Sequence, residues 1–187
     1  WSDSVYAGNL IHNRLNFHAT INDRLTARME IRNRIFAGTQ IQQVPSFGKM
    51  IDAYPGYWDM SKVWVDQEGL VVHSVIDRLL LQYATNKWVI TGGRQRINWG
   101  INNIWNPNDI FNTYNYLDFD YVERPGNDAI RVQHFMQQDK SIELAFKPGR
   151  SGGEAIAAGL YKFNHKKYDY QLLGGMYMTD IVVGGGW

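Results

Sequence analysis

Alternation of apolar and polar residues is the strongest pattern in the chain. Between residues 11 and 21 the odd positions are mostly apolar and the even positions are polar, and the pattern returns between residues 25 and 35 after the turn Asn22-Asp23-Arg24. A period of two gathers apolar side chains on one face of a β-strand, whereas in a helix they would spread around the cylinder. The two segments therefore predict an antiparallel hairpin whose apolar faces agree.

The same alternation predicts about eight strands in total. Beyond the first hairpin, strands are expected over residues 75–83, 88–99, 130–137, 142–147, 154–164 and 168–183. Soluble strands average about 5 to 6 residues, whereas strands that cross a bilayer need about 9 to 11. Because both strands of the first hairpin have 11 residues, the pattern favours a membrane-spanning sheet.

The connections between the expected strands differ in length at the two ends of the sheet. Short polar turns are expected at residues 22–24, 85–87, 138–140 and 165–167, and longer links at residues 37–70, 99–128 and 148–153. Outer-membrane β-barrels have short periplasmic turns and longer extracellular loops in this alternating order. The order of the connections therefore supports a membrane barrel over a soluble sheet.

These patterns predict an all-β fold, an antiparallel transmembrane β-barrel that occupies residues 1–187 as a single domain. Residues 37–70 and 99–128 are expected to form long loops that are extracellular or folded into the lumen. The last expected strand ends in Val183, three glycines and Trp187, which is a poor closing strand. Since an unpaired strand edge is unstable in lipid, the chain is expected to be a fragment of a larger barrel.

Composition excludes several kinds of site and segment but does not decide the fold. The chain is 44% hydrophobic and 20% charged, which is typical of a folded protein, and its net charge of +1 gives no reason to expect a nucleic-acid partner. It has no cysteine, so disulfides and thiolate metal sites are excluded. It also has no run of about 18 apolar residues, so a transmembrane helix is excluded, although barrel strands do not give that signal.

Basic residues dominate the polar faces of the expected strands. The predicted pore-lining residues are Arg14, Arg28, Glu30, Arg32, Arg34, Arg78, Arg94, Arg96, Arg131, Glu143 and Lys147. In a pore with low-dielectric walls such a surplus attracts anions, and guanidinium groups bind carboxylates or phosphates through paired hydrogen bonds. The alternative is that these arginines pair with acids and only stiffen the wall. We expect outer-membrane lipid around the sheet and a small anionic solute inside it.

The sequence gives little support for a catalytic or metal-binding site. His12 and His18 lie on one face of a strand but about 20 Å apart at the usual strand rise, which is too far to share a metal ion. Ser74 follows His73 directly, so the two side chains alternate to opposite faces and do not form a nucleophile and base pair. No catalytic residue, metal or cofactor is predicted.

A motif between residues 93 and 126 resembles one seen in porin-like outer-membrane proteins, where a Gly-Arg-Gln strand end runs into a loop carrying Asn-Pro-x-Asp. Here Gly93-Arg94-Gln95 is followed by Asn106-Pro107-Asn108-Asp109. The motif is similar to that of alginate-export-type porins and their uncharacterised Bacteroidetes relatives, which residues 121–126 also resemble. The resemblance implies a bacterial outer-membrane location and passive transport of small solutes, with the cargo unassigned.

The loop that carries this motif is too apolar to remain loosely solvated. It is expected to pack either against neighbouring extracellular loops as a lid or inward as a constriction, and the residues assigned to this role are Asn106, Pro107, Asp109, Asp118 and Asp120. Its acidic residues either face the wall arginines or only keep the loop soluble.

Two other functions remain alternatives. One is a plugged structural or scaffold barrel in an envelope complex for secretion, motility or nutrient uptake, with partner proteins bound to the long loops. The other is a soluble β-barrel or sandwich binding protein. Conductance would distinguish the porin from the plugged scaffold, and solubility without detergent would favour the soluble binder.

Overall fold

The computed structural model describes residues 7–52, 56–101, 106–111, 126–137, 139–151 and 153–187. These residues form ten strands and two short helices. The strands are β1 (Gly8–Asn22), β2 (Leu25–Gly38), β3 (Ser61–Gln67), β4 (Leu70–Ala84), β5 (Trp88–Gln95), β6 (Asn127–Gln137), β7 (Lys140–Lys147), β8 (Ile156–His165), β9 (Tyr168–Tyr177) and β10 (Asp180–Gly186), and the helices are α1 (Thr39–Gln42) and α2 (Phe47–Ile51).

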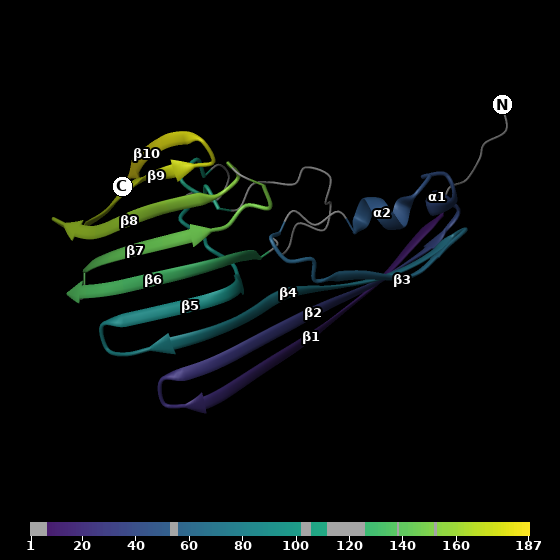
Figure 1. Ribbon diagram of the computed structural model, residues 1–187, viewed down its shortest axis with the longest axis horizontal. Helices are drawn as coiled ribbons and strands as arrows, with labels where there is room; N and C mark the ends of the chain where they lie inside the picture. Colours follow the sequence, from purple (N-terminus) through teal and green to yellow (C-terminus); the bar gives the residue numbers. More distant parts are fainter. Residues whose placement is uncertain (1–6, 53–55, 102–105, 112–125, 138, 152) are drawn as a thin grey trace.

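The strands form one antiparallel sheet, with β1 at one edge and β10 at the other (Figure 1). Its order is β1-β2-β4-β5-β6-β7-β8-β9-β10, while β3 pairs with the part of β4 that β5 does not reach. The prediction of an all-β antiparallel fold is confirmed. The sheet is not closed into a barrel, because within the described ranges β1 pairs only with β2 and β10 only with β9.

The expected number of about eight strands is wrong, for two separate reasons. The segment expected as one strand over residues 168–183 turns at Met178 and Thr179, where Met178 adopts a left-handed conformation with φ 56°, and returns as β10. Residues 37–70 are not simply a loop, because they contain α1, α2 and β3. β3 pairs along β4, and such a pairing is set by the partner strand and not by local alternation.

The two helices cover the end of the sheet away from the short turns (Figure 1). Phe36 of β2 contacts Phe47 of α2 edge to face, with ring centroids 5.1 Å apart. Ile41 of α1 and Val71 and Val75 of β4 are buried at this end. Just before β3, Asp59 accepts hydrogen bonds from the backbone N–H and the hydroxyl of Ser61, and these bonds lower the pKa of its carboxyl group.

Gly93 allows β5 to keep its pairing on both sides. The register with β4 and with β6 runs through Gly92, Gly93 and Arg94 without a shift, so the pairing contains no bulge at the two glycines. Gly93 instead has a φ of +111°, and a Cβ atom at this position would collide with the carbonyl oxygen of Leu79. The backbone therefore needs glycine at this position.

Replacing Gly93 by Ala is expected to lower the free energy of unfolding by more than about 1 kcal/mol, because alanine is strained at this φ. Denaturant unfolding of the protein would measure the loss. Gly92→Ala is the matched control, since a Cβ atom at Gly92 meets nothing within 4 Å. Equal effects of the two substitutions would contradict this explanation.

A bulge does occur in β4, opposite β2. The register changes between Glu30, which pairs with Arg78, and Ile31, which pairs with Ile76, so Asp77 is an extra residue in β4. Asp77 and Arg78 are consecutive and both buried. The bulge explains why alternation fails in this strand and places two charged neighbours inside the structure.

One face of the sheet is apolar and exposed. Cross-strand pairing aligns one row of residues from β1 to β10, namely Ala19, Ala27, Leu81, Gly92, Ile130, Phe146, Ala157, Met176 and Ile181. A second row, two residues along, contains Leu25, Tyr83, Ile90, Val132, Leu144, Gly159, Gly174 and Val183. We call these two rows the apolar belt. Ile130 and Leu144 in it are 57% and 55% exposed.

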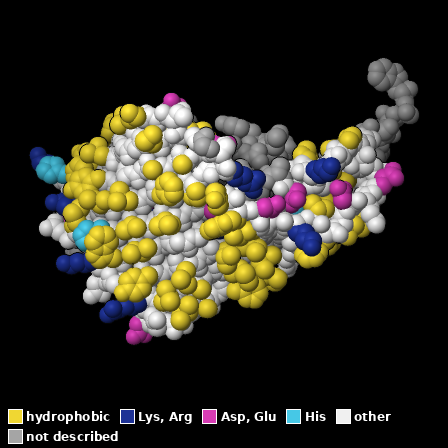
Figure 2. Space-filling model, in the orientation of Figure 1, with side chains coloured by type: hydrophobic (Ala, Val, Ile, Leu, Met, Phe, Trp, Pro, Cys, Tyr) yellow, Lys and Arg dark blue, Asp and Glu magenta, His cyan; other side chains and the backbone are white. Residues whose placement is uncertain are grey.

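The space-filling view agrees with this arrangement. Hydrophobic side chains spread over the strands on the left of Figure 2, and Lys, Arg and His lie at the left edge, where Figure 1 places the short turns. An apolar face whose margin is charged differs from the usual soluble sheet, in which the apolar face is buried against a second layer.

Candidate functional site

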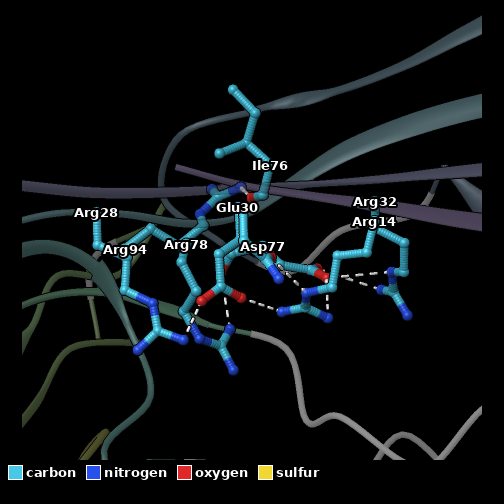
Figure 3. A network of polar contacts seen from close by, with 9 residues as sticks. Arg14, Arg28, Glu30, Arg32, Ile76, Asp77, Arg78 and Arg94 are labelled. Carbon is cyan, nitrogen blue, oxygen red and sulfur yellow. Dashed lines mark hydrogen bonds and ion pairs between the residues drawn. The ribbon is translucent and has the colours of Figure 1, made fainter. Parts of the chain in front are cut away.

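Charged side chains of β1, β2 and β4 form a compact network on the face opposite the apolar belt (Figure 3). The carboxylate of Glu30 forms ion pairs with Arg14 and Arg28. Asp77 forms ion pairs with Arg32, at 3.2 Å from Nε to Oδ2, and with Arg14, at 3.6 Å. Both acids are almost fully buried, and three arginines share their two negative charges. The network is therefore tightly paired yet remains positive.

These ion pairs hold the guanidinium groups in fixed places on this face of the sheet. Arg28 keeps more than half of its side chain exposed, at 56%, although it pairs with Glu30. Its charge therefore remains accessible to a solute.

A hollow of about 470 Å³ lies beside this network. Its charged lining residues are Arg28, Glu30, Arg78, Arg96 and Arg131, and most of the others are polar, including Asn16, His18, Thr26, Gln82, Thr91 and Gln95. Four arginines thus line the hollow against one acid. Such a surface favours small anions, because guanidinium groups offer several N–H donors to carboxylate or phosphate oxygens.

Glu143 of β7 connects the hollow with the other half of the sheet. It accepts two hydrogen bonds from Arg131, at 2.6 Å from Nε and 2.9 Å from Nη2, and one from Gln133 at 2.9 Å. It also accepts a hydrogen bond from the indole Nε1 of Trp99. Glu143 is 5% exposed. Its buried charge is therefore compensated by Arg131 and by two neutral donors.

Residues 97–101 and 106–111, which we call the inner segment, lie across the other half of this face. Ile97, Trp99 and Phe111 are almost fully buried, and Trp99 contacts Phe111 edge to face with centroids 4.9 Å apart. They belong to one apolar cluster with residues of β6 to β9, namely Ala129, Ala145, Ile156, Ala158, Leu160 and Leu173.

Polar contacts hold the inner segment to the last two strands. Gln171 donates a hydrogen bond from Nε2 to the carbonyl oxygen of Trp99, at 3.1 Å, and Asn108 donates one from Nδ2 to the carbonyl oxygen of Gly185, at 3.3 Å. The described part of this loop therefore packs on the strands β6 to β10. The site thus has an open polar half and a half filled by apolar packing.

The residues expected in the loop are divided between described and undescribed parts of the chain. Asp109 is buried and Asn106 is half-buried, whereas Pro107 is exposed. Asp118 and Asp120 lie outside the described residues. Asn127 and Asp128, expected at the end of the loop, belong to β6.

Arg94, expected in the pore lining, does not line the hollow. Its side chain is 0% exposed and binds Asp128 through two hydrogen bonds, at 2.8 Å from Nε and 2.9 Å from Nη2. It also donates to the carbonyl oxygens of Ile76 and Trp58. These partners belong to β6, β4 and the segment before β3. Arg94 of β5 therefore connects these three elements and does not face open space.

Other predicted lining residues are dispersed. Arg34 lies 3.4 Å from Nδ1 of His73, and Nε2 of His73 lies 3.1 Å from Asp52, at the end covered by the helices. Lys147 is half-buried near the end of β7. Arg14, Arg28, Glu30, Arg32 and Arg78 lie together, with Arg96 and Arg131 across the hollow.

Sequence reasoning missed two residues of the site, Asp77 and Gln133. Asp77 was visible only as a break in alternation, because a bulge has no reliable sequence signature of its own. Gln133 alternates with Arg131 on the same face, so its position in β6 was a usable signal.

No three His, Asp or Glu residues within the described ranges are grouped so that they could hold a metal ion. None of the helices in this part of the chain is long and apolar enough to cross a membrane. Comparison of the chain with protein-family models, curated proteins and solved structures found no match.

Proposed function

We propose that this chain forms part of the wall of a bacterial outer-membrane β-barrel that passes small solutes and prefers anions. The observation that carries the proposal is the apolar belt, which crosses nine strands in register while the opposite face carries buried ion pairs and the hollow. Lipid-facing apolar residues that alternate with polar lumen residues are the defining pattern of transmembrane barrels. Soluble proteins rarely expose so continuous an apolar surface.

Aromatic residues at both ends of the belt support a bilayer orientation. Tyr83 and Trp88 flank one short turn and Tyr168 follows another, and all three are exposed. Trp58, just before β3, and Trp64 of β3 are also exposed, and Trp64 donates a hydrogen bond from Nε1 to Ser74 at 2.9 Å. Rings with one polar end are favoured at both membrane interfaces.

The free edges of the sheet are part of the proposal. In hydrocarbon, unpaired backbone N–H and C=O groups cost several kcal/mol each, about as much as other buried polar groups without partners. In the proposed barrel the outer edges of β1 and β10 therefore pair with further strands.

Planar-bilayer recordings would test transport directly. We expect ohmic conductance. In a salt gradient we expect the zero-current potential to lie closer to the equilibrium potential of the anion than to that of the cation, because four arginines line the hollow against one acid. Replacing Arg96, which is exposed in the hollow, by Glu is expected to move this potential toward the cation. Arg150→Glu is the control, because Arg150 is exposed in the link between β7 and β8 and does not line the hollow. Cation selectivity of the unmodified protein would contradict the anion preference.

The inner segment favours one second candidate, a plugged barrel that serves as a scaffold in an envelope complex. Its apolar cluster fills half of the inner face, and a filled lumen carries no current. Partner proteins would then bind at the end that carries α1, α2 and β3. A protein that inserts into bilayers in folded form but does not conduct would support this candidate over the channel.

A further inference from the structure

Glu143 is placed where it affects both the charge of the hollow and the position of the inner segment. Its two carboxylate oxygens receive four hydrogen bonds from three residues that come from β6 and from the inner segment. A single carboxylate thus connects Arg131 of β6 with Trp99 of the inner segment.

We propose that Glu143 sets the charge selectivity of the channel by neutralising Arg131, and that Trp99 uses the same carboxylate only as a hydrogen-bond acceptor that anchors the inner segment. This inference rests on the proposed channel function. It assigns two separable roles to one residue, an electrostatic role toward Arg131 and a positioning role toward Trp99.

The electrostatic role follows from burial. Arg131 lines the hollow and its side chain is 23% exposed, whereas the side chain of Glu143 is 6% exposed and does not line the hollow. A solute in the hollow therefore meets Arg131 at its surface and Glu143 only behind it. Because water is largely excluded from the pair, the negative charge of Glu143 cancels much of the field of Arg131.

The positioning role does not need a negative charge. The indole N–H of Trp99 is a neutral donor, and a glutamine oxygen at position 143 can accept its hydrogen bond as a carboxylate oxygen does. The apolar contacts of Ile97, Trp99 and Phe111 also remain in such a variant. Glu143→Gln therefore removes the charge and keeps the anchor, while Trp99→Phe removes the hydrogen bond and keeps the charge.

Single-channel recordings of the full chain in a salt gradient test these roles. Glu143→Gln is expected to shift the zero-current potential toward the equilibrium potential of the anion. It is expected not to increase the fluctuation of the current. Trp99→Phe is expected to leave the zero-current potential unchanged and to increase the fluctuation of the current, because the inner segment is held less firmly. Glu154→Gln is the matched control, since Glu154 is an exposed acid in the link before β8.

A charge cycle provides a second measurement that does not depend on one variant alone. Arg131→Gln is expected to shift the potential toward the cation, and the double variant with Glu143→Gln is expected to lie near the unmodified protein, because the two charges are removed together. The inference is overturned if Glu143→Gln gives no shift, or if Glu154→Gln gives an equal one. Absence of conductance in the unmodified protein would instead overturn the channel function, and this inference with it.

Discussion

Replacing Leu144 by Arg is expected to lower the stability of the protein in a bilayer by about 2–4 kcal/mol, which is the cost of an arginine on the lipid face near the midplane of a barrel. Leu144 is 55% exposed in the middle of β7 and lies in the apolar belt between Val132 of β6 and Gly159 of β8. Unfolding by denaturant in lipid vesicles, followed by tryptophan fluorescence, would measure the change.

The same substitution distinguishes the membrane barrel from the soluble binding protein. In water an exposed leucine is replaced at a cost within about 0.5 kcal/mol, because no burial is lost. Met178→Arg is the control, since Met178 is 41% exposed in the turn between β9 and β10, outside the belt. A small effect at both positions, with a protein that remains soluble without detergent, would refute the membrane location.

Replacing Asp128 by Ala is expected to cost about 3–5 kcal/mol, because it leaves the guanidinium group of Arg94 buried without its counter-charge. The side chains of Arg94 and Asp128 are 0% and 1% exposed. The backbone N–H of Trp58 also loses its acceptor, the Oδ2 atom of Asp128 at 2.9 Å. Denaturant unfolding would measure the loss, and proteolysis between α2 and β3 would show whether this segment is released.

A double variant separates the cost of an unpaired charge from the value of the pair. Arg94→Met with Asp128→Leu removes both charges and keeps apolar volume, so it is expected to be less destabilised than Asp128→Ala alone. The explanation would fail if the double variant were the less stable of the two.

The first hairpin shows what local sequence can predict. Its apolar positions Ile11, Leu15, Phe17 and Ile21 are all exposed on one face of β1, and the register with β2 pairs Ile11 with Ile35 as alternation implied. Period-two alternation is a property of neighbouring residues, so it fixes the direction of each side chain without knowledge of the rest of the fold. The opposing face carries Arg14, Glu30 and Arg32, also as predicted.

Several features that the sequence did not predict depend on distant parts of the chain. β3 exists through pairing with β4, and Asp77 faces inward because of a bulge opposite Glu30 and Ile31. The acids of residues 99–128 were expected either to face the arginines or to keep the loop soluble, but nothing in the sequence indicated that Asp128, 34 residues away, is the partner of Arg94. Local patterns contain no information about which segment supplies the partner.

The sequence by itself determined the all-β antiparallel class, the short turns and the separation of apolar from arginine-rich faces, because each depends on the alternation of adjacent residues. Only the tertiary structure decided that the sheet is open within the described residues, that the inner segment packs on β6 to β9, and that four arginines surround one hollow. These features result from contacts between residues far apart in the chain, whose free energy depends on burial and charge pairing that no local pattern specifies.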